Sequence, residues 1–342
     1  MMKKIAVIGA GSWGTALSLV LADNGHEVTL YGRDQKNVDA INENHENTQF
    51  LPDVTLPESL RATTVLKDAV EGATYILIVT PSSAIREVSR QLNELLTSPV
   101  VLIHASKGIE PKTHLRLSEL MEEEIDPSKR SAVCVLTGPS HAEEVALRKP
   151  TTVTVASTDM EEAGRVQELF TNDNFRVYLN ADIIGAELGG AFKNIIALAA
   201  GMADGLGYGD NAKAALITRG MVEIARLGTL FGANPMTFTG LTGMGDLIVT
   251  CTSVHSRNWR AGNAIGRGEK LETVLENMGM VVEGVRATQA AYDLAGTKQC
   301  ELPITTALYH VLFDGHTPAE EVQKLMRRPQ KNEIEYLFTL KD

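Results

Sequence analysis

A single basic residue, Lys193, lies within a long run of apolar and small residues at 182–205. Residues three, four and seven positions apart share one face of an α-helix, so we expect Lys193 to share its face with residues such as Gly189 and Ile196. A face this smooth lets a cofactor or a substrate approach an ammonium group closely. The alternative is a lysine whose charged end reaches past the helix edge into water.

A second chemical group is Ser256-Arg257-Asn258, which combines a hydroxyl, a planar forked cation and an amide. Arginine binds phosphate through two parallel charge-assisted hydrogen bonds, so this trio suits a phosphate monoester. The alternative is a helix N-terminal cap followed by a solvated arginine. Asp246 stands in a glycine-rich turn, where it could orient a lysine or be an ordinary turn residue.

A third group is the glycine motif Gly9-Ala10-Gly11-Ser12-Trp13-Gly14, which follows an apolar run at 4–8. A helical pattern continues through Asp23, and residues 27–31 have the pattern of a second strand. Strand, glycine loop, helix and strand form the context in which GxGxxG binds a dinucleotide.

Each glycine of this motif has a physical task. Gly9 makes the tight turn, Gly11 lets backbone amides approach the pyrophosphate, and Gly14 permits close packing of helix and strand. The anion then lies at the helix N-terminus, where N–H groups and the helix dipole favour negative charge. After the second strand, Arg33 stands where an acidic residue would bind the ribose of NAD, and its guanidinium suits a 2′-phosphate. NADP(H) is therefore the preferred cofactor, with NAD(H) as the second option because Asp34 stands beside it.

Alternating strands and helices are expected to position these groups. Further buried strands are expected at 75–79, 100–104, 132–136, 151–156 and 175–179, with a helix at 160–170. This pattern predicts an α/β fold whose N-terminal part is a Rossmann-type, mostly parallel sheet with helices on both faces. After Asn180 the strand-like runs stop, which predicts an all-α C-terminal domain. We therefore expect a dinucleotide-binding domain at 1–180 and a helical substrate-binding and catalytic domain at 181–342.

Within the second part, helical spacing predicts helices at 212–231, 288–295 and 305–313, and residues 241–258 are expected to be irregular.

The carboxyl ends of parallel strands are where ligands bind in an open sheet. Lys107 follows the strand at 100–104 and is placed to meet cofactor or substrate, unless it is an ordinary surface lysine. Ser140 and Glu143 follow the strand at 132–136 and fit a capping box, which predicts a helix N-terminus at a second such position. Capping alone would also explain this pair.

Composition narrows the classes of function. A hydrophobic fraction of 44% and a charged fraction of 22% are ordinary globular values. A formal net charge of −11 argues against a broad nucleic-acid surface. The cysteines Cys134, Cys251 and Cys300 show no close pair and no metal-like spacing, so we expect a reducing cytosol and no metal. No uninterrupted apolar run reaches the roughly 20 residues that span a bilayer, so we expect a soluble protein without membrane insertion.

Together these pieces make the chain similar to the NAD(P)-dependent glycerol-3-phosphate dehydrogenase family of bacterial type. The resemblance covers essentially the whole chain and rests on seven motifs in order. They are GAGSWGTAL at 9–17, ASKGIE at 105–110, TGPSHAEEV at 137–145, ELGGAFKNIIALAAG at 187–201, TGMGDLIVTC at 242–251, SRN at 256–258 and VVEG at 281–284.

The resemblance implies a role for each matching residue, with Lys193 as the proton donor and acceptor. It implies a cofactor site that contains Ser12, Trp13, Arg33, Lys107, Ala142, Val281 and Glu283. It implies substrate contacts from Gly138, Ser140, Asp246, Ser256, Arg257 and Asn258, together with Lys107 and Lys193. Arg257 would bridge the substrate phosphate and the cofactor. The family often has a second basic or histidine residue after Arg33, whereas this chain has Asp34, which affects only the choice between NAD and NADP.

The resemblance also implies the reaction, which is reduction of dihydroxyacetone phosphate to sn-glycerol 3-phosphate by hydride transfer from NAD(P)H. It implies a cytoplasmic enzyme of phospholipid precursor synthesis, commonly a homodimer. Two alternatives stay open. A β-hydroxyacid or ketopantoate-type reductase has a similar layout but takes a carboxylate substrate. A non-catalytic NAD(P) sensor would use the same fold without needing Lys193.

Overall fold

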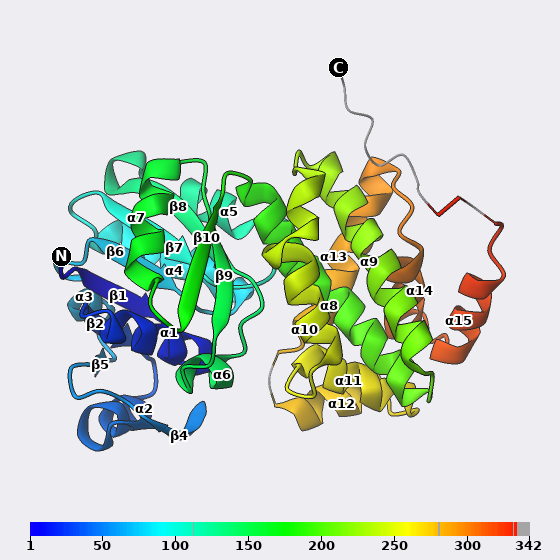
Figure 1. The fold of residues 1–342 in the computed structure, drawn as a ribbon, viewed down its shortest axis with the longest axis horizontal. Coiled ribbons are helices and arrows are strands. Elements are labelled where there is room, and N and C mark those ends of the chain that lie inside the picture. The colour runs from blue at the N-terminus through cyan, green and yellow to red at the C-terminus, as the bar shows by residue number, and fades with distance from the viewer. Residues whose placement is uncertain (112, 280, 331, 334–342) are drawn as a thin grey trace. The chain divides into compact units, whose positions relative to one another are not determined.

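The computed structural model describes residues 1–111, 113–279, 281–330 and 332–333. The chain divides into two compact units, Met1–Ile183 and Ile184–Asp342. Figure 1 labels the helices and strands of both units.

A mostly parallel sheet forms the centre of the first unit, with strand order β10-β9-β8-β7-β6-β1-β2-β5. Its strands are β1 (Lys4–Ile8), β2 (Glu27–Tyr31), β5 (Arg61–Thr63), β6 (Tyr75–Ile78), β7 (Val100–His104), β8 (Arg130–Thr137), β9 (Thr151–Ala156) and β10 (Phe175–Asn180). β9 pairs antiparallel with β8, and the other neighbouring strands of this sheet pair parallel. A separate short hairpin joins β3 (Glu46–Asn47) to β4 (Leu51–Thr55). The predicted mostly parallel sheet is confirmed.

Helices cover both faces of this sheet. The strands are therefore apolar along nearly their whole length, because residues on both faces must be buried. Ile5 and Val7 of β1 join one buried cluster, whereas the alternate residues Ala6 and Ile8 join another. The first cluster includes side chains of α1 (Ser12–Asp23), α6 (Ala142–Ala146) and α7 (Met160–Phe170). The second includes side chains of α3 (Leu66–Val70), α4 (Ile85–Leu95) and α5 (Leu117–Glu124). Figure 1 shows these helices around the sheet.

The second unit is helical, as predicted. Its helices are α8 (Ile183–Gly205), α9 (Asp210–Leu230), α10 (Asp246–Thr252), α11 (Arg257–Gly266), α12 (Leu271–Met278), α13 (Glu283–Lys298), α14 (Pro303–Phe313) and α15 (Pro318–Met326). By length and composition α8 is apolar enough to cross a membrane, which the sequence expectation overlooked because Glu187 and Lys193 interrupt its apolar run. Its most apolar window is 89% buried, as in a core helix.

Small residues let α8 and α11 pack with their backbones in contact. A Cβ atom added to Gly201 of α8 would lie 2.0 Å from the carbonyl oxygen of Trp259. In the reverse direction, a Cβ on Gly262 of α11 would lie 1.9 Å from the carbonyl oxygen of Leu198. Real Cβ atoms do not come this close, so the crossing of these two helices requires glycine at both positions.

Two local expectations are wrong. Ser140 does not cap a helix with Glu143, because α6 begins at Ala142 with His141 as its N-cap, and Ser140 Oγ instead donates to the carbonyl of Gly138 at 3.0 Å. The stretch at 241–258 is largely helical rather than irregular. It contains a π-helical turn at Leu241–Gly245 and then α10, so Asp246 begins a helix and does not lie in a loop.

Candidate functional site

The glycine motif of the first unit has the geometry that a dinucleotide requires. Gly9 has a φ of 124°, and a Cβ there would lie 2.5 Å from the carbonyl oxygen of Val79. A Cβ on Gly14 would lie 1.9 Å from the carbonyl oxygen of Gly9. By contrast, a Cβ on Gly11 would meet nothing within 4 Å. Gly9 and Gly14 therefore serve the turn and the packing, while open space beside Gly11 leaves room for a pyrophosphate.

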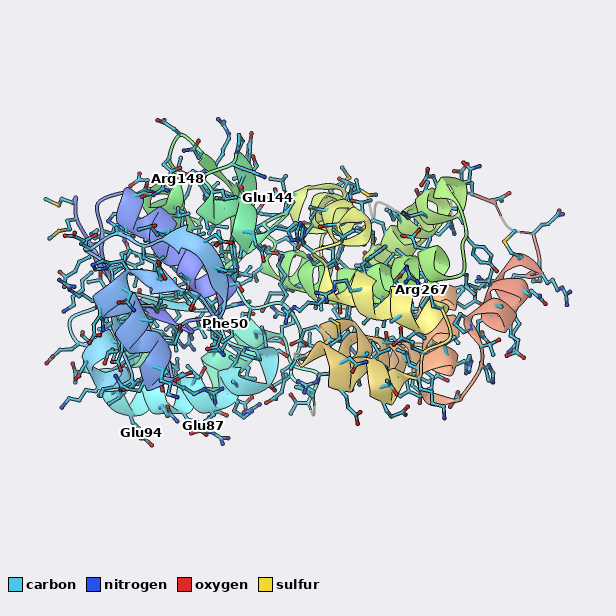
Figure 2. The ribbon with its side chains drawn as sticks, turned by 90° about the horizontal axis from the view of Figure 1, so that it is seen from below. Phe50, Glu87, Glu94, Glu144, Arg148 and Arg267 are labelled. Atoms are coloured by element: carbon cyan, nitrogen blue, oxygen red, sulfur yellow. The ribbon has the colours of Figure 1, made fainter. Side chains whose placement is uncertain are left out.

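The N-terminus of α1 lies directly after this open space. Gly11 is its N-cap and has no side chain to occupy the N–H groups of the first turn, which suits an anion. Ser12 begins the helix, and its Oγ donates to the carbonyl of Phe50 at 2.6 Å. Phe50 is labelled in Figure 2. Trp13 is partly buried against the first core cluster.

The position after β2 is basic and exposed. Arg33 is solvent-exposed, and Asp34 is the N-cap of α2 (Gln35–Asp39). The Asp34 carboxylate accepts a hydrogen bond from the backbone N–H of Lys36 at 3.0 Å. Because this capping role explains Asp34, its presence does not by itself indicate a ribose ligand.

Three residues predicted to bind cofactor or substrate meet at one carbonyl group. Lys107 Nζ donates to the carbonyl of Gly138 at 3.3 Å, and Ser140 Oγ donates to the same oxygen at 3.0 Å. Gly138 has a φ of 139°, and a Cβ there would lie 3.0 Å from Cα of Val153. Lys107 is half-buried. Ala142, another predicted cofactor contact, is buried at the start of α6.

The second unit contains a buried ion pair between Lys193 and Asp246. Lys193 is 4% exposed and Asp246 is 1% exposed, which rules out a lysine that reaches into water. The ammonium group donates to the Asp246 carboxylate and, at 2.7 Å, to Oγ1 of Thr250. Thr250 donates its own proton to the carbonyl of Asp246 at 2.6 Å. The hydroxyl oxygen thus faces the ammonium as an acceptor, and both partners hold the group in place.

The Ser256-Arg257-Asn258 trio forms the start of α11. Ser256 is the N-cap, and its side chain accepts from the N–H of Trp259 at 3.2 Å, so the capping alternative holds for this residue. Arg257 is exposed, and its Nη1 donates to the carbonyl of Val281 at 3.4 Å. This contact joins two residues of the predicted cofactor site. Glu283, a third such residue, is the first residue of α13.

Asn258 is buried and connects three helices of the second unit. Its Nδ2 donates to Oδ1 of Asn194 at 2.9 Å, and its Oδ1 accepts from the N–H of Gly284 at 2.8 Å. Since Asn194 directly follows Lys193 on α8, this chain of bonds ties the lysine's helix to the starts of α11 and α13. Asn258 therefore braces the helices that carry the other candidate residues.

Sequence reasoning did not identify Thr250 and Asn194. A signal existed for both: Thr250 lies four residues after Asp246, which is one helical turn, and Asn194 is adjacent to Lys193. The first was missed because residues 241–258 were expected to be irregular.

Other reactive groups offer little support for a different chemistry. Burial raises the pKa of the Cys134 and Cys251 thiols to about 12, so neither presents a thiolate near neutral pH. Within the described residues, no three His, Cys, Asp or Glu side chains are grouped as a metal site would require.

Comparison with known proteins gives one family for both units. Residues 4–163 match the family described as NAD-dependent glycerol-3-phosphate dehydrogenase N-terminus, and residues 182–323 match its C-terminus. Two relatives named glycerol-3-phosphate dehydrogenase [NAD(P)+] are similar over nearly their whole length. The one from an Exiguobacterium species is 69% identical, covering 98% of this chain and 99% of the relative. The one from Bacillus pumilus is 62% identical, covering 99% and 98%.

A solved structure is also similar. The crystal structure of glycerol-3-phosphate dehydrogenase from Coxiella burnetii matches with a TM-score of 0.90 and 40% identity, covering 96% of this chain and 99% of that one.

Proposed function

The chain belongs to the NAD-dependent glycerol-3-phosphate dehydrogenase family, and on that premise we propose that it reduces dihydroxyacetone phosphate to sn-glycerol 3-phosphate with NAD(P)H. The observation that carries this proposal is the buried ammonium group of Lys193, held by Asp246 and Thr250 on a smooth helix face. Such a group suits a reaction in which negative charge develops on a carbonyl oxygen.

The roles follow from the chemistry of ketone reduction. When NAD(P)H is bound, its nicotinamide would supply the hydride for the carbonyl carbon. Lys193 stabilises the charge that develops on the carbonyl oxygen and then donates a proton to it. Asp246 and Thr250 keep the ammonium in one orientation, so little reorganisation is needed when the charge appears. In the reverse direction, Lys193 accepts the proton of the alcohol.

The phosphate of the substrate is assigned to the start of α11. Arg257 is exposed there and has a forked guanidinium, which matches the geometry of phosphate. Ser256 and Asn258 flank it. From the first unit, Lys107, Gly138 and Ser140 are proposed as substrate contacts. Binding energy at this remote end fixes the orientation of the carbonyl, which is how a non-reacting group contributes to rate.

The cofactor is assigned to the first unit. Its adenosine side would lie near Arg33, which favours NADPH over NADH because a guanidinium pairs with the 2′-phosphate. We further propose that residues 1–180 act as the dinucleotide-binding domain and 181–342 as the substrate-binding and catalytic domain. Val281, Glu283 and Arg257 are proposed as cofactor contacts from the second of these.

The cellular role is the supply of a glycerophospholipid precursor, in a homodimeric enzyme of the cytoplasm. The three cysteines, all in the described part of the chain, are free, which fits a reducing compartment.

The test follows the loss of NADPH or NADH absorbance when dihydroxyacetone phosphate is added to the purified protein. We expect oxidation of both cofactors, faster at equal low concentration with NADPH, and no reaction with pyruvate, ketopantoate or unphosphorylated dihydroxyacetone. Turnover with ketopantoate instead would indicate the carboxylate-specific reductase. Cofactor binding without oxidation by any of these carbonyl compounds would indicate a sensor.

A further inference from the structure

The loop that carries Lys107 has a firm attachment on its N-terminal side. The N–H of Ala105 donates to the carbonyl of Ile78 at 3.0 Å, and Ser106 Oγ donates to the carbonyl of Thr80 at 2.6 Å. The next residue after Lys107 is Gly108, with a φ of 138°. A glycine places little restriction on the chain, so the orientation of Lys107 also depends on what holds the loop beyond it.

Beyond Gly108 the loop pairs with itself through the N–H of Glu110, which donates to the carbonyl of Leu115 at 3.0 Å, and an ion pair ties it to α4. Arg86 binds Glu110 through two parallel hydrogen bonds, from Nε to Oε1 at 2.6 Å and from Nη2 to Oε2 at 2.7 Å. The two side chains are only 19% and 12% exposed. The remaining nitrogen, Nη1, binds Glu123 at 3.2 Å and also Glu124, both at the end of α5.

This pair differs from an ordinary surface salt bridge. Exposed pairs contribute little, whereas a two-point, mostly buried arginine–carboxylate pair fixes geometry. The hydrogen bonds from Arg86 lower the pKa of Glu110 to about 2, so the carboxylate stays charged throughout the working pH range. Arg90 of the same helix also binds a carboxylate at two points, that of Glu124, but its side chain is 56% exposed and does not contact the Lys107 loop. Glu87 and Glu94 are exposed and point outward in Figure 2.

We propose that Arg86 and Glu110 are positioning residues that hold the Lys107 loop so that its ammonium group lies at the carbonyl of Gly138. This inference rests on the proposed function, in which Lys107 contacts cofactor and substrate. Glu110 lies three residues after Lys107, and Arg86 couples it to both α4 and α5. Loss of this two-point attachment releases the loop from α4 and α5 and shifts the ammonium group, and small displacements of a positioning group can cost up to about 100-fold in rate.

Kinetics of the full-length protein test the proposal, with Arg86→Gln, Glu110→Gln and Lys107→Met as single variants. Arg86→Gln and Glu110→Gln are each expected to lower kcat/KM for dihydroxyacetone phosphate by about tenfold. Arg86→Lys keeps the charge but only one donor point, so it should recover only part of that loss. Arg90→Gln is the matched control. Arg90 lies one turn along α4 and binds Glu124 at 2.8 Å without contacting Glu110, so kcat/KM should change less than twofold.

The decisive measurement is the double variant Lys107→Met with Arg86→Gln. If Arg86 acts through Lys107, the second change adds little to the loss caused by Lys107→Met alone. If the losses in kcat/KM of the two single variants multiply in the double variant, the proposal is overturned. A loss in Arg90→Gln equal to that in Arg86→Gln would also overturn it. If Arg86→Gln does not fold, the double variant Lys107→Met with Glu110→Gln replaces it. Glu110→Gln disrupts the same ion pair, so its effect with and without Lys107→Met can be compared in the same way. A Lys107→Met enzyme with normal kcat/KM would instead refute the role of Lys107 in the proposed function, a result that the first single variant reveals directly.

Discussion

At the scale of residues, Lys193 is the group on which the proposed chemistry depends. Replacing it with alanine removes the proton donor, so kcat should fall by about 10² to 10⁴ or more, with little change in the affinity for NADPH. Steady-state kinetics and a fluorescence titration of NADPH measure the two quantities. Near-normal turnover in Lys193→Ala would remove the lysine from the mechanism.

A second variant must separate the catalytic effect of Lys193→Ala from its effect on stability, because Asp246 is buried beside the lysine. Lys193→Ala leaves a carboxylate that is 1% exposed without its cation, which can cost about 3 to 5 kcal/mol of stability. The double variant Lys193→Ala with Asp246→Asn removes both charges and should recover much of the thermal stability while staying inactive. A recovery of activity together with stability would show that the single variant failed through misfolding.

Arg33 decides the choice of cofactor in this proposal. Arg33→Gln should raise KM for NADPH by about tenfold or more and leave KM for NADH within about twofold, because only NADPH offers a phosphate to the guanidinium. Asp34→Asn serves as the matched neighbour. It retains an oxygen for the cap of α2, so it should change neither preference nor stability strongly. Equal effects of Arg33→Gln on both cofactors would contradict this assignment.

The sequence indicates which residues are candidates for the site, but it does not indicate their partners. Lys193 stood out because a charge within small and apolar neighbours is unusual, and the glycine motif stood out because its spacing has a physical meaning. The contact of Lys193 with Asp246 spans 53 positions in the chain, so no local pattern could establish it. The shared carbonyl of Gly138, which joins Lys107 to Ser140, depends in the same way on pairing between strands.

At the scale of elements, glycines set how closely α8 and α11 approach. Gly262→Ala would place a Cβ 1.9 Å from the carbonyl oxygen of Leu198, so we expect a loss of about 2 to 3 kcal/mol in unfolding free energy. Gly296→Ala on α13 is the control, because a Cβ there meets nothing within 4 Å. It should be neutral or stabilise by up to about 1 kcal/mol through helix propensity. Urea unfolding of both variants measures the difference, and similar values would contradict the close approach.

A buried carboxylate, Glu223 of α9, holds the start of α14. It accepts hydrogen bonds from the N–H of Ile304 at 2.6 Å and from the N–H and Oγ1 of Thr305, both at 3.1 Å. Burial raises the pKa of Glu223 to about 7 despite these bonds. The folded protein therefore holds this proton more tightly than the unfolded chain does, and the contribution of Glu223 to stability falls as pH rises from about 4.5 through 7.

Glu223→Gln tests this pH dependence because its amide stays neutral at every pH. A rise of the pKa from 4.5 to about 7 corresponds to roughly 3 kcal/mol, so the wild type should lose up to that much more stability than Glu223→Gln between pH 5 and pH 8. Urea unfolding at both pH values gives the change in unfolding free energy for each protein. Subtracting the change in Glu223→Gln from that in the wild type removes the contribution of other titrating groups. The same pH dependence in both proteins would show that Glu223 does not titrate in this range.

Regular elements were predictable where the hydrophobic period was strong. The strands at 151–156 and the helix at 160–170 match β9 and α7 at both ends. The helix α10 was missed because Gly243 and Gly245 precede it and two threonines and a cysteine lie in its last turn, a composition typical of a loop. The capping box at Ser140 failed because its hydroxyl bonds to Gly138 and leaves the cap position to His141. In both cases tertiary contacts outweighed a local preference.

At the scale of the whole molecule, the chain divides into the units Met1–Ile183 and Ile184–Asp342. We expect the first unit to bind the cofactor and the second to carry the catalytic lysine, and a fragment can test this. Residues 1–183 contain the glycine motif, Arg33 and two buried clusters of their own, so we expect this fragment to fold and to bind NADPH. Affinity should be lower by about tenfold, since contacts proposed for Arg257, Val281 and Glu283 are missing. Turnover should be absent because Lys193 is not included.

Gly11→Asp in the same fragment separates specific binding from non-specific attachment. Open space beside Gly11 means that the new side chain fits without strain on the fold, while its bulk and charge oppose a pyrophosphate. Circular dichroism should show an unchanged fold, and titration should show that NADPH binding is lost. If the folded fragment binds no NADPH, or if Gly11→Asp binds it as well as the parent does, then the cofactor does not depend on the first unit as proposed. The assignment of residues 1–180 as the dinucleotide-binding domain would then be wrong, even in an enzyme whose overall reaction is as proposed.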